Sequence, residues 1–348
     1  MNDDSEPKSL DIVPLESKTA QELLECRLDR ASWIIEGLIA VGLVVLAGAP
    51  KIGKSWFVLL LALCVSLGEP FLSHATQQAG VLYLCLEDTY SRIQQRLFRL
   101  TDSANDDLHL VVASRKLKDG LIEQLKAFIG SHPAIRLVIV DTLQVVREVC
   151  RDGVYAVDYN DLGSLKRFAD ENNIAVLLVH HTRKMADEAN VFNMVSGSNG
   201  IVGSADETLV LSKTNAFDSK ATLSVTGRDV ELAEYKLAFK DCHWILIEQT
   251  SREELEERQI PDSVLKIIGF MAERTSDWSG TATQLIDEAD ISDMQGNILT
   301  KYLNEHSVFL EERGIEYRNH RTAQARLISL SKIARLEDPC LLADDGNE

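Results

Sequence analysis

The chain has 348 residues and a formal net charge of −18 at pH 7, and 45% of its residues are hydrophobic. This length and composition predict a globular protein with one large domain and one smaller domain. So acidic a surface repels nucleic acid on average, which argues against a protein that binds DNA over its whole surface. A local basic patch or a pore stays compatible with this charge.

The N-terminus and the cysteines favour a cytoplasmic protein. The first twenty residues are acidic and contain no apolar signal core. The longest apolar run, 56–67, is too short to span a bilayer. The six cysteines form no CxxC pair, so we expect free thiols in a reducing compartment.

In chain order, the polar segment 1–18 is expected to be disordered, and 19–250 forms the larger domain. Its apolar runs alternate with helical patterns, and continuous apolar strands separated by helices predict a parallel sheet covered on both faces. This is a doubly wound α/β core. The expected strands are Leu43–Ala47, Val81–Leu86, Leu137–Val140 and Ile174–Val179, and the expected helices start at Lys54 or span 91–100, 121–129 and 160–172.

The pattern changes after residue 205. Four short apolar runs between 207 and 249 are expected as antiparallel strands added to one edge of the sheet. The charged segment 251–261 is expected as a linker. Residues 262–336 predict three helices and a two-stranded wing, the winged-helix arrangement. An acidic tail, 337–348, ends the chain.

The stretch GAPKIGKS matches the phosphate-loop pattern G-x-x-x-x-G-K-[ST] in full. Glycines let backbone N–H groups surround a β-phosphate, Lys54 reaches the β- and γ-phosphates, and the hydroxyl of Ser55 is a Mg²⁺ ligand. A strand precedes the loop and a helix follows it, so a chance match is a poor rival. We therefore expect ATP and Mg²⁺ as cofactors, bound by Gly48, Ala49, Pro50, Lys51, Ile52, Gly53, Lys54, Ser55 and Trp56.

Two further strands end in carboxylates. Asp141 follows an apolar strand, in the position of a residue that holds the metal. The next residue is Thr142, so the water-activating Glu of many ATPases is missing there. Glu87, at the end of another strand, is the candidate general base. Asp88 is the second candidate, or it caps the following helix.

The order of LAGAPKIGKS, YLCLED, LVIVDTL, LLVHHTRK, GSADETLVL and VTGRDVE resembles the RepA-type hexameric ATPases and helicases. They form a RecA/DnaB-like branch found on plasmids, phages and other mobile elements. The resemblance covers about 30–250 and implies a RecA-like P-loop core. It also implies that His181 rather than His180 senses the γ-phosphate, in line with strand alternation.

In the resembled family, an arginine at the position of Arg228 reaches the nucleotide of a neighbouring subunit, in a ring of six. Lys213 is an alternative cation for that role. The simpler interpretation is a hairpin arginine that pairs with Asp229 or a nearby Glu. For the two consecutive histidines a metal site is a poor interpretation, because no cluster with ligand spacing accompanies them.

Two segments are candidates for DNA contact. The resemblance implies that the glycine- and serine-rich stretch 184–206 is a mobile loop facing a central channel. Lys184 is its only strong cation, which weakens the case for DNA translocation. The predicted wing carries the basic cluster Arg313, Arg318, Arg321, Arg326, Lys332 and Arg335, which suits phosphate contacts or a protein partner equally.

The sequence therefore predicts a Mg²⁺-dependent ATPase and DNA helicase that unwinds or remodels DNA in the replication of a mobile element. A regulatory or recombinase-like ATPase, similar to KaiC or RadA, is the alternative. In that class ATP controls assembly or partner binding without unwinding. A small-molecule kinase is a third class, disfavoured by the missing acceptor-binding lid and by the position of Glu87.

Overall fold

The computed structural model describes residues 17–27, 32–147, 154–182, 191–195, 199–215, 218–292, 294–321 and 326–333. Most of the predicted disordered segment, 1–16, and the whole acidic tail lie outside these ranges. The chain divides into two compact units, 1–249 and 250–348, and each is described by itself. In the described parts of the chain, no helix is both long and apolar enough to cross a membrane.

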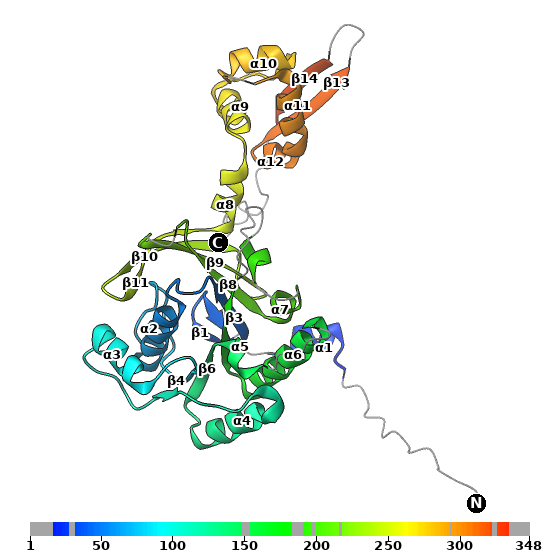
Figure 1. Cartoon of the computed structure of the whole chain (residues 1–348). Helices are drawn as coiled ribbons and strands as arrows, with labels where there is room; N and C mark the ends of the chain where they lie inside the picture. The colour runs from blue at the N-terminus through cyan, green and yellow to red at the C-terminus, as the bar shows by residue number, and fades with distance from the viewer. Residues whose placement is uncertain are drawn as a thin grey trace, which may run out of the picture. The chain divides into compact units, whose positions relative to one another are not determined.

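A nine-stranded sheet forms the centre of the first unit, with the order β11-β10-β9-β8-β3-β7-β6-β4-β5. The strands β5, β4, β6, β7, β3 and β8 are parallel, and β9, β10 and β11 continue one edge in antiparallel fashion (Figure 1). The strands are β3 (Gly42–Gly48), β4 (Gly80–Cys85), β5 (Leu108–Val111), β6 (Ile135–Asp141), β7 (Ala175–His181), β8 (Glu207–Ser212), β9 (Lys220–Gly227), β10 (Ala233–Lys240) and β11 (His243–Thr250).

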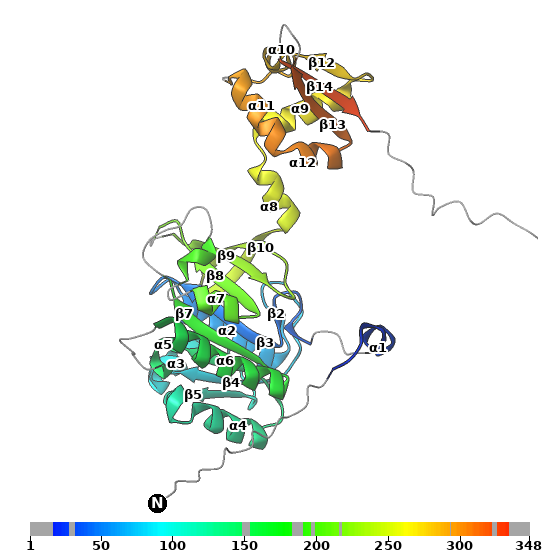
Figure 2. The ribbon, with the colours of Figure 1, turned by 90° about the vertical axis from the view of Figure 1, so that its right-hand side faces the viewer.

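Helices cover both faces of this sheet, which confirms the predicted α/β core. One face carries α2 (Lys54–Leu67) and α3 (Tyr90–Leu100), together with the hairpin of β1 (Trp33–Ile35) and β2 (Ile39–Ala40). The other face, which Figure 2 presents, carries α4 (Leu121–Ser131), α5 (Leu143–Val146), α6 (Val154–Asn172) and α7 (Asn199–Ser204). The remaining elements of this unit are α1 (Ala20–Glu25), η1 (Leu117–Asp119) and η2 (Val191–Met194).

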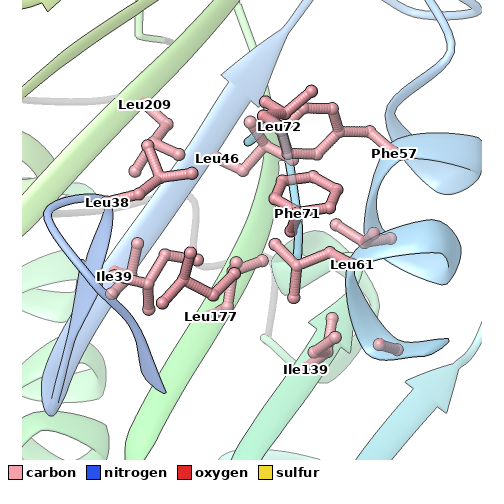
Figure 3. Packing of buried hydrophobic residues seen from close by; sticks show 14 of the residues in the cluster. Leu38, Ile39, Leu46, Phe57, Leu61, Phe71, Leu72, Ile139, Leu177 and Leu209 are labelled. Carbon is pink, nitrogen blue, oxygen red and sulfur yellow. The ribbon is translucent and has the colours of Figure 1, made fainter. Parts of the chain in front are cut away.

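Alternation along the strands divides the core into two layers. Val44 and Leu46 of β3 point toward α2, while Val45 points toward α6. Phe57 of α2 meets Phe71 edge to face at 5.1 Å, and Figure 3 shows both rings packed beside Leu46. Because both faces are covered, the strands are apolar along their length, which is the reason their sequences showed no alternation.

Three expectations about this unit were wrong or incomplete. The first of the four late strands, β8, runs parallel to β3 and is not part of the antiparallel addition. The edge strand β5 was not expected, because its four residues are all only partly buried. Within the predicted channel loop, η2 and α7 are regular, and Val195 and Ile201 are buried in the core. Residues 184–190 and 196–198 of that loop lie outside the described ranges.

The second unit has its own apolar core. The predicted linker contains a helix, α8 (Arg252–Gln259), and the three predicted helices correspond to α9 (Asp262–Glu273), α10 (Ala282–Glu288) and α11 (Gly296–Glu305). A short α12 (Ser307–Glu312) precedes the hairpin of β13 (Ile315–Arg321) and β14 (Arg326–Lys332). A third strand, β12 (Trp278–Gly280), pairs with β14 and was not expected. The winged-helix assignment stays a prediction.

Two carboxylates bind the backbone at the ends of the parallel strands that lie opposite the phosphate loop. Asp206 accepts a hydrogen bond from the backbone of Leu43 at 2.9 Å and pairs with Lys166 of α6 at 2.8 Å. Glu207 is 1% exposed and accepts from the backbone N–H of Ala40 at 2.9 Å. Burial, more than the nearby Asp229 and Asp206, raises the pKa of Glu207 to about 8.

Glu207→Gln should remove a pH dependence of folding stability. The folded chain keeps the Glu207 proton up to about pH 8, whereas the unfolded chain loses it near the ordinary value of 4.5. Wild-type stability therefore falls as pH rises through this window, on the order of a few kcal/mol, and the amide variant escapes that loss. Thermal melting at pH 5, 7 and 8.5 measures the difference.

The exposed Glu231→Gln is the matched control, and its melting temperature should follow pH as the wild type does. If the Glu207→Gln and wild-type proteins lost stability equally between pH 5 and 8.5, the carboxyl would not be protonated in the fold.

Candidate functional site

The phosphate-loop pattern folds as a turn between β3 and α2. β3 ends at Gly48, and α2 begins at Lys54 with no side-chain cap on its first N–H groups. Lys51 and Gly53 have positive φ angles of 65° and 109°, which bend the chain back before the helix starts. The uncapped N–H groups and the positive end of the α2 dipole point to the loop, as an anion site requires.

Lys54 is 6% exposed and lies folded onto the loop. Its Nζ donates to the carbonyl oxygens of Gly48 at 2.7 Å and Ala49 at 3.0 Å, and lies 3.3 Å from Nδ1 of His181. Burial lowers the pKa of Lys54 to about 8, although the charges of Asp141 and Glu87 act in the opposite direction. The loop therefore holds a desolvated cation that an anionic ligand would stabilise.

Trp244 of β11 packs against the phosphate loop at Gly53, a contact that sequence reasoning missed. Its indole Nε1 donates to the carbonyl of Gly53 at 3.2 Å, and the residue is 3% exposed. A Cβ on Gly53 would lie 2.8 Å from the indole ring. Lys213 sits over the same ring at 5.5 Å. The pattern of β11 gave no signal of this contact, because it joins residues 191 positions apart.

Asp141 ends β6 inside the site and is 6% exposed. Its carboxylate accepts from the hydroxyl of Tyr83 at 3.0 Å and from the side chain of Ser55. Burial raises the pKa of Asp141, while the hydrogen bonds from Ser55 and Tyr83 and the charge of Lys54 lower it. Tyr83, fully buried on β4, is a second contact that the sequence did not reveal.

Glu87 lies in the turn after β4 and approaches the end of β6. The hydroxyl of Thr142 donates to Oε1 of Glu87 at 3.0 Å, and Thr142 itself is 2% exposed. The sequence has a threonine at 142 where many ATPases have the catalytic glutamate, which made Glu87 the candidate base. Thr142 binds this same carboxylate.

Asp88 is tied to α3 by two arginines. Its two carboxylate oxygens accept from Arg92 at 2.7 Å and from Arg96 at 2.5 Å. The helix is capped by Thr89, whose side chain accepts from the backbone N–H of Arg92. The expectation that Asp88 caps this helix was wrong, because the next residue takes that position. Both carboxylate oxygens of Asp88 are thus occupied by guanidinium groups.

These groups surround a pocket of about 340 Å³. Ser55 and Asp141 both line the pocket, and their side chains are hydrogen-bonded to each other. Their oxygens are a donor set that fits Mg²⁺, which keeps several waters and takes few protein ligands. Among the residues that the structure describes, no group of three or more His, Cys, Asp or Glu could hold a metal ion by itself. The pocket is lined by Lys51, Gly53, Lys54, Ser55, Trp56, Glu87, Asp88, Arg92, Arg96, Asp141, Thr142 and His181.

The two consecutive histidines point to different sides of β7. His181 lines the pocket and lies beside Lys54, whereas His180 is 4% exposed and does not line it. Burial, followed by the charge of Lys54, lowers the pKa of His181. The lowered pKa favours the neutral ring, whose Nδ1 can accept from Lys54.

Arg228 is far from the phosphate loop of its own chain. It follows Gly227, which pairs with Glu207 at the start of β8, whereas Gly48 pairs with Leu211 four residues later. This offset is about 13 Å along the strands. Arg228 is 62% exposed and pairs with Asp206 at 3.2 Å, not with the expected Asp229 or a Glu. Lys213, by contrast, lies beside its own loop.

The basic cluster of the second unit is partly neutralised. Arg313 pairs with Glu257, Arg318 pairs with Glu316 at 2.6 Å, and Lys332 donates to the carbonyl of Arg274. Arg321 and Arg326 face each other across the hairpin. Arg335, and Lys184 in the predicted channel loop, lie outside the described residues.

A family model described as an AAA domain matches residues 10–187. A comparison with curated proteins found no match.

Similar solved structures share little sequence with this chain. One, described as an ATPase domain, has 16% identity and a TM-score of 0.49, covering 60% of this chain and 85% of that one. A DnaB-like replicative helicase, solved to show its interactions with primase, has 15% identity, a TM-score of 0.49, and coverages of 60% and 58%. A KaiC-like protein from Pyrococcus horikoshii OT3 has 11% identity, a TM-score of 0.46, and coverages of 63% and 99%.

Gly53→Ala should disrupt the phosphate loop. A φ of 109° strains any residue with a Cβ, and the added carbon would press against Trp244. The strain costs about 1–3 kcal/mol, and we expect nucleotide affinity to fall at least about tenfold. Titration with a fluorescent ATP analogue measures it.

Gly130→Ala is the control, since its Cβ would enter open space on α4. It should leave affinity unchanged and stabilise the helix slightly. Adding Trp244→Leu to Gly53→Ala should restore little affinity, because the backbone strain persists. Wild-type affinity in Gly53→Ala itself would contradict the assignment of the loop.

Proposed function

The chain belongs to the AAA domain family, and from this membership we propose that it binds ATP with Mg²⁺ and hydrolyses it. One observation carries the proposal. Lys54 from α2, Asp141 from β6 and Glu87 from the turn after β4 converge on a single pocket beside the phosphate loop. A cation for the phosphates, an oxygen ligand for the metal and a carboxylate that can accept a proton are the parts that phosphoryl transfer to water needs.

We assign a role to each group. The backbone of Gly48–Ser55 surrounds the phosphates, and Lys54 exchanges its carbonyl partners for phosphate oxygens. Ser55 and Asp141 would hold the metal, and a bound Mg²⁺ would neutralise charge on the phosphate. Glu87 accepts a proton from the attacking water. The neutral His181, beside Lys54, senses the γ-phosphate as an acceptor or donor.

Arg228 acts, in this proposal, on the nucleotide of a neighbouring subunit. Its distance from its own loop leaves no role for it in the site of its own chain. Its side chain is exposed and available to a second copy. An arginine supplied in this way stabilises transition-state charge, with effects on the order of 10³–10⁵ in rate. The active form is then a ring, and six subunits follow from the resemblance to RepA-type proteins.

We propose that the ATPase drives unwinding or remodelling of DNA in the replication of a mobile element. This coupling rests on the motif order, which resembles RepA-type helicases. In this organisation 19–250 is the ATPase domain, 251–261 the linker and 262–336 a winged-helix-like domain. Three of the six cations in the basic cluster of that domain have partners within the chain and Arg335 lies outside the described residues, so Arg321 and Arg326 are the strongest candidates for DNA contact there. DNA-stimulated ATP turnover with strand displacement separates this function from that of a regulatory ATPase.

Glu87→Gln should retain ATP binding and lose hydrolysis by about 10²–10⁴-fold, because the amide cannot accept the proton of water. The amide oxygen can still accept from Thr142, so the turn should keep its position. Nucleotide affinity and phosphate release are measured on the same preparation. Loss of affinity together with turnover would show that Glu87 is structural.

Mixing two inactive variants tests the arginine in trans. Lys54→Ala removes the cation that binds the phosphates, and Arg228→Ala removes the arginine supplied to the neighbouring subunit. Each homo-oligomer should therefore be inactive. In mixed rings, an intact loop can meet an intact Arg228 from its neighbour, and partial ATP turnover should return. Turnover is measured across mixing ratios, with Arg258→Ala in place of Arg228→Ala as an active control. An absence of recovery at every ratio would count against an arginine acting in trans.

A further inference from the structure

The turn that carries Glu87 contributes one apolar residue to the core, the partly buried Leu86. It leads into α3, where Ile93 is the single fully buried residue and the neighbouring Leu97 and Leu100 are partly buried. A helix held by so little apolar surface moves easily unless polar contacts fix it. The position of Glu87 therefore depends on what ties the start of α3 to the phosphate loop.

Asp88 supplies such a tie. Its side chain is only 10% exposed and receives two guanidinium groups of α3, one of them from Arg96 at 2.5 Å. The side chain of Arg96 is 20% exposed, so this pair is screened less by water than a surface pair. Arg92, at 57% exposure, is the outer and weaker partner.

Arg96 extends the connection to the phosphate loop. Its guanidinium lies 5.5 Å from the ring centroid of Trp56, a cation–π contact. Trp56 follows Ser55 directly on α2, and its ring meets Phe239 of β10 edge to face at 6.3 Å. A continuous series of contacts thus joins the residue after Glu87 to the residue after Ser55.

We propose that Asp88, Arg96 and Trp56 are positioning residues that hold Glu87 at a fixed distance from the phosphate loop. This inference rests on the proposed function, since it assumes that Glu87 activates water. The backbone bond from Leu86 to the carbonyl of Asp141, at 2.8 Å, fixes the other side of the turn. Thr142 orients the carboxylate itself, while the three positioning residues fix the segment that bears it.

Asp88→Asn and Arg96→Gln test this inference in the full-length chain. Each should lower kcat about 10- to 100-fold, because a displacement of about 1 Å at a catalytic group has effects of that size. Affinity for a fluorescent ATP analogue should change less than about threefold, since the phosphate loop is intact. A role in stability alone would lower the melting temperature without this selective fall in kcat.

Two comparisons sharpen the test. Trp56→Phe keeps an aromatic face for Arg96 and should retain more turnover than Trp56→Leu. Arg99→Gln removes the same charge from the same helix outside the pocket and should turn over ATP at the wild-type rate. If Asp88→Asn does not fold, Arg96→Gln and the Trp56 pair decide by the same criteria.

The outcomes separate this inference from the proposed function. If Glu87→Gln is inactive while Asp88→Asn and Arg96→Gln turn over ATP within about twofold of wild type, the positioning role is wrong and the ATPase assignment stands. If Glu87→Gln hydrolyses ATP at the wild-type rate, the assignment of the base is wrong and the inference falls with it. Equal losses of affinity and kcat would also overturn the positioning role.

Discussion

The shared carboxyl edge of four parallel strands is the constraint on which the rest of the structure depends. Gly48 is level with His181, Asp141 with Val179, and Cys85 with Asp141, so β3, β7, β6 and β4 end within two residues of one another. A phosphate loop, a histidine and two carboxylates are thereby delivered to one place by backbone pairing alone. One residue of slippage in any pair would turn a strand's side chains to the opposite face and dissolve the site.

That geometry also explains the electrostatics of the pocket. The same burial lowers the pKa of Lys54 and raises that of Asp141, so each charged form is costly by itself. Their mutual attraction, with hydrogen bonds from Ser55 and Tyr83 to the carboxylate, offsets part of this cost. A site built in this way favours a ligand that brings both a phosphate anion and a metal cation.

The sequence predicted the core strands, the phosphate loop and Asp141 because each depends on local patterns: continuous apolar runs, a fixed glycine spacing and a strand-terminal carboxylate. The contacts that support the site could not be predicted from these local patterns. Trp244 meets Gly53 across 191 positions, and the direction of β8 depends on the crossover through α7, which has weak helical signals. From the sequence, Thr142 shows only that position 142 lacks a glutamate. No spacing pattern predicts which residue accepts a hydrogen bond from a threonine hydroxyl.

At the opposite end of the parallel strands, Arg228 pairs within its own chain, but with Asp206 and not with the expected Asp229 or a Glu, and its action on a neighbouring subunit stays a proposal. The carboxylate of Asp206 has three partners: Arg228, Lys166 and the backbone N–H of Leu43. An arginine 62% exposed to water gains about 0–1 kcal/mol from such a pair, so the proposed exchange of that partner for a phosphate in another subunit would cost little. Meanwhile the bond from its backbone N–H to the carbonyl of Asp206, at 2.8 Å, keeps the hairpin in place. The ion pair of Arg228 within its own chain is therefore compatible with the proposed role of this residue in a neighbouring subunit.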